Sequence, residues 1–307
     1  NDILSVASAT KGATMYGGAG NDTLTGDANG VNTLWGEAGN DILTGGSKAD
    51  TIDGGTGTDT YVGELTEQAG SSTTVGMVIN LGAELSQSTV YGTTANFLSS
   101  AAATVASNTA VYLYNGESTT NAVVVDTLVD IENATGGSGT DYIVGSDAAN
   151  TITGGTGADD MTGGKGADTF VFGAADSVAA SAQSAAVGVA TEFDVGDTIT
   201  FGNGVDIITD FTAGEGGDVL KGVDAGVPTT AIDVALGTTT GLAANTTYFL
   251  SGTYVASTGV FTITADGATG SSTLIIEGAG NAVTANTDMV LLVGVDSDGL
   301  VASNLVA

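Results

Sequence analysis

A nine-residue unit repeats along residues 17–62 and again along residues 136–171, and no other feature of the sequence restricts the fold as strongly. Seven of the nine units have glycine at two or more of positions one, two and four, and each unit has Asp or Asn at position six and an apolar residue at position eight. The residues at position six are Asp22, Asn32, Asp41, Asp50 and Asp59 in the first tract and Asp141, Asn150, Asp159 and Asp168 in the second. Those at position eight are Leu24, Leu34, Leu43, Ile52, Tyr61, Ile143, Ile152, Met161 and Phe170.

The composition of the unit predicts a turn followed by a short strand. Glycine adopts positive φ angles at little cost, so the first half of each unit forms a tight turn whose carbonyl oxygens and single carboxylate point into one small space. Calcium, which takes roughly six to eight oxygen ligands, suits such a space between neighbouring turns. The glycines expected to supply carbonyl ligands are Gly18, Gly20, Gly55, Gly57, Gly137, Gly139, Gly155, Gly157, Gly164 and Gly166. Because each strand points one apolar residue inward, too little for a core of its own, the units must stack.

The repeated pattern resembles the RTX family of secreted calcium-binding proteins. The resemblance implies a parallel β-roll in which two units make one coil, so that residues 18 apart lie one above the other. The pairs with this spacing are Asp41 and Asp59, Asn32 and Asp50, Asp141 and Asp159, and Asn150 and Asp168. Asp22 and Asp41 are one residue further apart, and an extra residue near Gly30 and Val31 explains this as a bulge in a turn. Three acids off the pattern, Asp27, Asp147 and Asp160, are expected only to solvate turns.

The charge composition is extreme, with 35 acids against four lysines, no histidine and a formal net charge of −31. A chain with this charge is not expected to bind nucleic acid. Since 42% of the residues are hydrophobic, we expect a core that closes only when divalent cations neutralise the acids, so that metal binding and folding are one equilibrium. The absence of cysteine is compatible with export, and no apolar stretch approaches the roughly 20 residues of a transmembrane helix.

Catalytic residues are not evident in the sequence. Without His, Cys or Arg there is no triad, no thiol nucleophile and no zinc site of the usual kind. Paired carboxylates are the remaining option, but calcium would hold these acids ionised, so we expect a protein that is not an enzyme. The sequence opens in the second half of a unit, with Asp2 at position six as a further candidate ligand and no cleavable signal, so we expect a longer parent protein.

The expected fold class is all-β, a parallel β-roll with insertions followed by a small antiparallel β unit. The segments are a first roll segment at residues 1–62, an insertion and re-entry at 63–135, a second roll segment at 136–220 with an insertion at 172–196, and a C-terminal strand unit at 221–307. The resemblance implies that residues 126–136 return the chain to the same roll, where Glu132 offers a further oxygen.

Inside the insertions, residues 76–82 and 110–116 are typical of strands, whereas residues 98–107 and 174–190 fit either a short helix or a loop. The roll is expected to resume at residues 197–200.

Residues 201–209 make another unit, with Asp206 at position six. The segment after it resembles the closing turn of the family. There Asp210 and Asp218 are either ligands or ordinary acids that cap the end of the roll.

The resemblance extends to RTX-bearing coat proteins of Gram-negative bacteria, which share this richness in Gly, Ala and Thr and this scarcity of basic residues. It implies a calcium-dependent surface-layer protein that is secreted by the type I machinery, located at the cell surface, and assembled with itself into a two-dimensional lattice. Surface polysaccharide is a further partner, through a missing N-terminal part. The alternatives are the calcium-folding and secretion module of a larger exoenzyme or toxin, and the end of an RTX adhesin. Residues 300–307 are either part of an export signal or a closing strand.

Overall fold

The computed structural model describes residues 1–6, 11–63, 76–86, 104–114, 122–173, 182–184, 196–201, 205–222, 247–265, 268, 270–277 and 289–306. These residues form strands and turns with two short 3-10 helices, η1 (Ser297–Gly299) and η2 (Ala302–Asn304), and they contain no α-helix. None of the helical turns in this part of the chain has the length and apolar character needed to cross a lipid bilayer. The chain divides into two compact units, Asn1–Gly155 and Thr156–Ala307, and the expected all-β class is confirmed.

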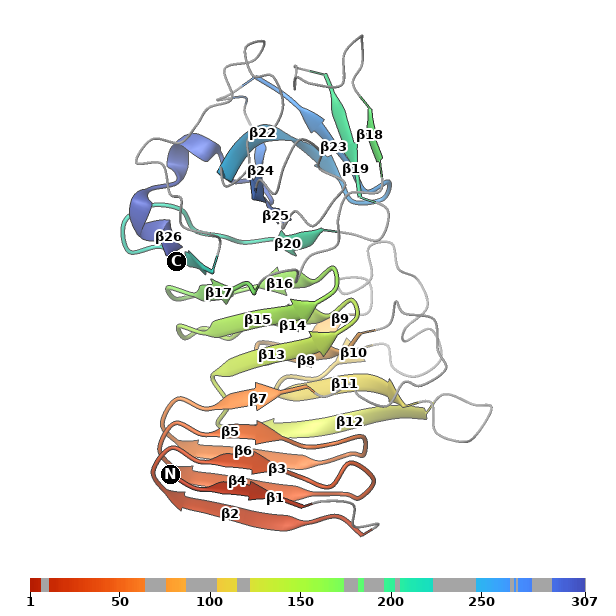
Figure 1. Cartoon of the computed structure of the whole chain (residues 1–307), viewed down its shortest axis with the longest axis vertical. Helices are drawn as coiled ribbons and strands as arrows, with labels where there is room; N and C mark the ends of the chain where they lie inside the picture. Colours follow the sequence, from red (N-terminus) through yellow and green to blue (C-terminus); the bar gives the residue numbers. More distant parts are fainter. Residues whose placement is uncertain are drawn as a thin grey trace. The chain divides into compact units, whose positions relative to one another are not determined.

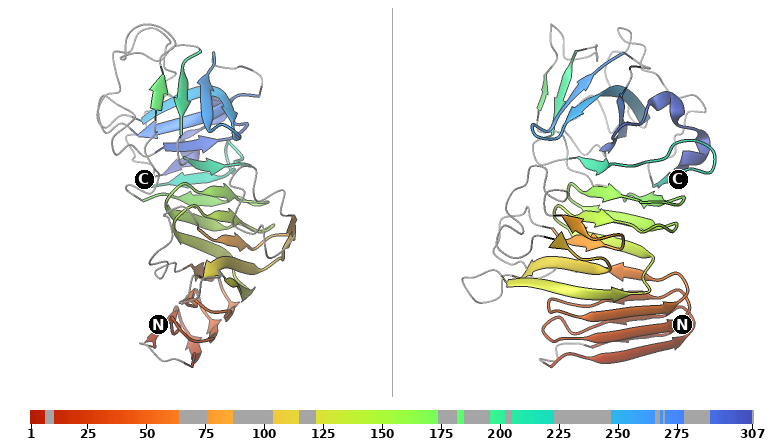
Figure 2. Two further views of the ribbon diagram at one scale, coloured as in Figure 1. Left: turned by 90° about the vertical axis from the view of Figure 1, so that its right-hand side faces the viewer. Right: turned by 180° about the vertical axis from the view of Figure 1, so that it is seen from behind.

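The repeat strands of the first unit alternate between two sheets, which is the arrangement of a β-roll. One sheet runs in the order β1 (Ile3–Ser5), β3 (Thr23–Thr25), β5 (Ile42–Thr44), β7 (Thr60–Val62), β13 (Asn133–Ser138) and β15 (Thr151–Thr156). The other contains the neighbours β2 (Thr14–Ala19), β4 (Thr33–Ala38), β6 (Thr51–Thr56) and β12 (Ala122–Val129). The pairings within this stack of N-terminal strands are parallel, and the stack is visible in Figure 1 and from behind in Figure 2.

The strand register confirms the coil length that the resemblance to the RTX family implies. Thr33 pairs with Thr51 across two regular units, whereas Thr14 pairs with Thr33 across the longer unit. The extra residue therefore lies in a turn, where Val31 is exposed, and it shifts the register without breaking either sheet.

The insertion of the first unit leaves the roll and returns to it. Strand β8 (Val78–Asn80) pairs antiparallel with β11 (Thr109–Tyr114), and β11 pairs antiparallel with β12. Both strands predicted at residues 76–82 and 110–116 are therefore confirmed. A second small sheet joins β9 (Leu85–Ser86) to β10 (Thr104–Val105), so the end of the segment 98–107 is a strand and turn, while residues 98–103 lie outside the described residues.

Pairing at the return point shows that the part of the second tract within the first compact unit continues the first roll. Strand β12 pairs parallel with β6, which aligns Thr127 with Thr51, and β13 pairs parallel with β7, which aligns Asn133 with Thr60. Strand β14 (Tyr142–Val144) then pairs parallel with β8, so one strand of the insertion is itself part of the stack.

The second unit begins with repeat strands and ends with an antiparallel sheet. Strands β16 (Asp160–Thr162) and β17 (Thr169–Val171) pair parallel with β20 (Asp206–Ile208) and β21 (Val219–Lys221), respectively. Strand β26 (Leu305–Val306) pairs parallel with β21, so these two residues form a closing strand. The antiparallel neighbours are β18 (Ala182–Ser184), β19 (Thr198–Thr200), β23 (Val260–Ile263), β22 (Thr247–Val255), β24 (Ser272–Glu277) and β25 (Met289–Leu292).

Two expectations need correction in the second unit. Residues 197–200 do not resume the roll, because β19 pairs antiparallel with β18 and β23. The described part of the segment 174–190 is the strand β18, and its other residues lie outside the described part of the chain.

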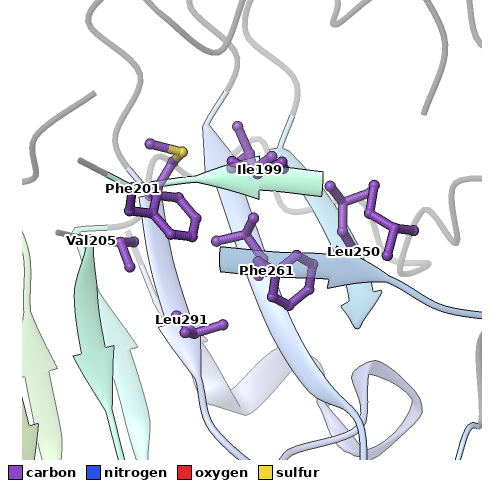
Figure 3. Packing of buried hydrophobic residues seen from close by; sticks show 10 residues of the cluster. Ile199, Phe201, Val205, Leu250, Phe261 and Leu291 are labelled. Carbon is purple, nitrogen blue, oxygen red and sulfur yellow. The ribbon is translucent and has the colours of Figure 1, made fainter. Parts of the chain in front are cut away.

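Apolar side chains of the antiparallel sheet form a conventional core. Ten buried residues make one cluster, and six of them, Ile199, Phe201, Val205, Leu250, Phe261 and Leu291, are labelled in Figure 3. Strand β25 also pairs parallel with β20, so the antiparallel strands and the repeat strand β20 belong to one sheet of this unit. The small antiparallel β unit expected after the roll is confirmed.

Candidate metal centre

Every residue at position six of the nine repeat units is buried, as is every residue at position eight. Side chains two residues apart on a strand share a face, so the inward-facing apolar residue directs the preceding acid inward as well. Asp is rarely buried without a partner, because removing a carboxylate from water is costly. Seven buried aspartates in these turns therefore require a compensating charge or a set of hydrogen bonds.

One column of position-six residues in the first unit consists of Asp22, Asp41 and Asp59, which we call the aspartate edge. The backbone N–H of Asp22 donates to Asp41 Oδ1 at 2.7 Å, and that of Asp41 donates to Asp59 Oδ1 at 2.7 Å. Asp59 N–H donates to Glu132 Oε2 at 2.8 Å, so Glu132 takes the next place in the column. The oxygen proposed for Glu132 at the re-entry turn is thus in line with the repeat acids.

The opposite column consists of Asn32, Asp50 and Asp126, which we call the amide edge. Asn32 N–H donates to Asp50 Oδ1 at 2.5 Å, and Asp50 N–H donates to Asp126 Oδ1 at 2.9 Å. Asp126 lies in the return segment rather than in a repeat unit, and its side chain is fully buried. Sequence reasoning missed this residue, although its DTL segment copies positions six to eight of a unit.

Each carboxylate of the aspartate edge has one oxygen in use and one without a partner. The Oδ2 atoms of Asp22, Asp41 and Asp59 are buried and have no hydrogen-bond donor, and the same holds for Asp50 Oδ2. A buried carboxylate oxygen without a partner costs more than an ordinary lost hydrogen bond, since the group is charged. These atoms are oriented as ligands of a cation.

Backbone oxygens lie beside these unpartnered atoms. A Cβ on Gly17 would lie 2.8 Å from the carbonyl oxygen of Gly36 and 2.9 Å from Asp22 Oδ2, so glycine leaves both oxygens free to face the same space. At Gly54 the corresponding neighbours are Asp59 Oδ2, at 2.7 Å, and the carbonyl oxygen of Asp130. No three acidic side chains converge in the part of the chain that the structure describes, so carbonyl oxygens must supply most ligands, as calcium allows.

The turn glycines have the backbone conformation that the sequence predicts. All ten glycines that were expected to supply carbonyl ligands have positive φ, including Gly18 at 98° and Gly20 at 118°. The only non-glycine at position two of these units with a positive φ among the described residues is Glu37, at 74°. A side chain in that conformation is strained, so Glu37 marks a position where the repeat departs from its own geometry.

Burial raises the pKa of three acids in these two columns. Desolvation raises the pKa of Asp50 and of Asp59 from 3.8 to about 6, and it raises the pKa of Asp126 to about 7. A nearby divalent cation favours the charged form and would reverse these shifts. The residues therefore fit calcium in two ways. They supply oxygen ligands, and their carboxylates need the positive charge that the ion would bring.

The second tract crosses the boundary between the two compact units, at residues 155 and 156. Within the first unit, Asp141 Oδ1 accepts the backbone N–H of Met77 at 2.6 Å, and Asn150 Nδ2 donates to the carbonyl oxygen of Glu132. Within the second unit, Asp159 N–H donates to Asp206 Oδ1 at 3.0 Å, and Asp168 N–H donates to Asp218 Oδ1 at 2.8 Å. Asp206 and Asp218 thus take position-six places beyond the recognised repeats.

Asp210 and Asp218 use both carboxylate oxygens to hold turns. Asp210 accepts the N–H groups of Gly163 at 2.9 Å and Gly164 at 2.8 Å. The second oxygen of Asp218 accepts Thr212 N–H at 2.7 Å. These contacts favour the view that both acids cap the end of the roll.

The remaining candidates divide by burial. Asp2 is exposed, and only its backbone N–H joins the column, by donating to Asp22 Oδ1 at 2.5 Å. Asp147 is exposed as expected. The expectation that Asp27 only solvates a turn is wrong, because Asp27 is fully buried and its Oδ2 has no partner. Asp160 is also partly buried, and this burial raises its pKa to about 6.

Position five carries a second ladder that sequence reasoning passed over. Asn40 N–H donates to Asn21 Oδ1 at 3.0 Å, and Thr58 N–H donates to Asn40 Oδ1 at 3.1 Å. The exposed amides brace the outer side of the aspartate edge, and the recurring Asn-Asp pairs at residues 21–22 and 40–41 were the signal for it.

Comparison with known families agrees with this geometry. A family model described as RTX calcium-binding nonapeptide repeat (4 copies) matches residues 13–29, 28–61 and 135–170. No curated protein matches the chain significantly.

Proposed function

We propose, from the premise that both tracts are RTX calcium-binding nonapeptide repeats, that this chain is a structural subunit of a calcium-dependent bacterial surface layer. In this proposal the protein leaves the cell by type I secretion, folds on extracellular calcium and assembles with copies of itself. Its role is mechanical rather than catalytic. A part of the protein outside this sequence would anchor the layer to surface polysaccharide.

The buried, unpartnered Oδ2 atoms on the aspartate edge are the observation that supports calcium binding. Extracellular calcium modules bind with dissociation constants of roughly 10⁻⁴ to 10⁻³ M, far above cytosolic calcium. Inside a cell the acids would stay unpaired and repel one another, which leaves the chain extended enough to be exported. Outside, calcium would close the turns.

The net negative charge of the chain supports calcium-dependent assembly with its own copies. A chain with a net charge of −31 and four lysines has few cations for direct ion pairs with its own copies, so divalent ions are the available bridges. Apolar side chains on the outer faces of the first unit, among them Tyr16, Ile42 and Val125, offer contact area once the charge is bridged. Repetition of two such interfaces would give a sheet.

Electron microscopy of the purified chain in millimolar calcium or magnesium tests the proposal. Ordered sheets should form with calcium and not with magnesium, whose strict octahedral geometry suits these turns poorly. A chain that folds with calcium yet stays monomeric at every concentration would contradict the surface-layer role, and would favour a secretion module of a larger exoenzyme or toxin.

A further inference from the structure

The two edges of the roll in the first unit differ in whether a hydrogen-bond donor reaches the buried oxygens of the turns. On the aspartate edge the unpartnered oxygens of Asp22, Asp41 and Asp59 face carbonyl oxygens, with no hydrogen donor among them. On the amide edge a nitrogen takes the equivalent place. A Cβ on Gly26 would lie 2.8 Å from Asn32 Nδ2, just as one on Gly17 would lie 2.9 Å from Asp22 Oδ2.

The amide of Asn32 fills the space that a cation would fill. Its Nδ2 lies 3.0 Å from the carbonyl oxygen of Asp27, 3.0 Å from that of Gly30 and 2.9 Å from that of Gly45. It also lies 3.1 Å from Asp50 Oδ1. The two N–H groups are shared among four oxygens from two successive turns, so these oxygens are satisfied without metal.

Phenol hydroxyls do the same at the other end of the amide edge. Tyr61 O–H donates to Asp126 Oδ2 at 2.8 Å, which satisfies the oxygen that stays unpartnered in the aspartate edge. Tyr112 O–H lies 2.8 Å from the carbonyl oxygen of Gly46 and 2.9 Å from that of Lys48. Both rings are buried, so water does not compete for these bonds.

We propose that the turns at Asn32 and Asp126 are closed by their own hydrogen-bond donors and bind no calcium, whereas the aspartate edge binds it. The inference rests on the proposed calcium binding, and it removes Asn32, a position-six residue, from the expected ligands. Only Asp27 and Asp50 keep an unpartnered oxygen on the amide edge. The roll therefore has one edge that senses calcium and one that is largely built without it.

Counting bound calcium in the full chain tests this, by equilibrium dialysis with atomic absorption. Asn32→Asp replaces the amide donors by a carboxylate among the same carbonyl oxygens, and should bind about one more ion than the natural chain. Asn32→Ala and Asp126→Asn should bind the natural number. Asp41→Asn, the matched change on the aspartate edge, should lose about one ion.

The outcomes distinguish a failure of the proposed calcium binding from a failure of the division between the edges. A natural chain that binds no calcium would overturn the proposed function itself. A natural chain that binds calcium, with an ion lost in Asn32→Ala or Asp126→Asn, would overturn only the division between the edges. Where Asn32→Ala does not fold, Asn32→Asp decides alone, since an unchanged count there contradicts the claim that the Asn32 amide occupies the place of a cation.

Discussion

The repeat stack of the first unit and the antiparallel sheet of the second unit are both β-structure, but they bury different kinds of side chain. Each repeat unit buries one apolar side chain together with one Asp or Asn, as in the pairs Leu43 with Asp41 and Tyr61 with Asp59. The antiparallel sheet buries ten apolar residues as one cluster. Hydrophobic burial stabilises the second arrangement unconditionally, whereas the first also has to offset buried carboxylates. Its stability therefore depends on what neutralises them.

Removal of calcium should produce the largest difference in stability between these two regions. With excess chelator, amide hydrogens of β3 and β5 should lose their protection against exchange, because the aspartate edge is left with uncompensated carboxylates. Amides of β22 and β24 should stay protected. Equal loss in both regions would show that the antiparallel sheet also depends on the metal.

Matched substitutions in the two regions sharpen the same contrast. Leu43→Ala and Leu291→Ala each remove a fully buried side chain and should lower the free energy of unfolding by about 2 to 5 kcal/mol in calcium. Asp41→Asn should destabilise the chain in calcium and have little effect in chelator, because its contribution passes through the ion. The measurement is urea unfolding in both conditions, and a calcium-independent effect of Asp41→Asn would count against ligation.

Acid should partly replace calcium. The folded-state pKa values of Asp50 and Asp59, about 6, exceed the ordinary value of 3.8, so the folded chain binds more protons than the unfolded chain between these limits. The stabilising effect of protonation is thus full below about pH 4 and is lost as the pH rises through about 6. Melting of the calcium-free chain should occur at higher temperature at pH 5 than at pH 7.5. The opposite order would mean that these acids are stabilised as carboxylates without metal.

The smallest effect expected is at the turn that lacks its glycine. Glu37→Gly relieves a side chain held at a φ of 74° and should raise stability in calcium by about 0.5 to 1 kcal/mol. Glu84→Gly is the control, since Glu84 has no positive φ and gains nothing from glycine. A loss of stability in Glu37→Gly would show that the Glu37 side chain contributes more than the strain costs.

The sequence predicted the features that repeat and missed those made by long-range pairing. The bulge near Val31 and the inward-facing residues of each unit follow from local spacing, whereas the coil length followed from the resemblance to the RTX family. The role of Asp126 depends on β12 pairing with β6, for which the short DTL segment was the only local sign. The role of Tyr112 depends on β11 pairing with β12, and that pairing leaves no local pattern. Residues 197–200 copy the end of a repeat unit, but β23 offers an antiparallel partner that the repeat pattern does not reveal.

Scanning calorimetry across a range of calcium concentrations tests the central claim, that calcium is part of the folded repeat stack. A ligand that binds only the folded state raises its stability by RT ln(1 + [L]/Kd), so the Tm of the repeat transition should climb steadily with the logarithm of calcium concentration and be lowest in chelator. An unfolding profile that is identical in chelator and in millimolar calcium would contradict the account.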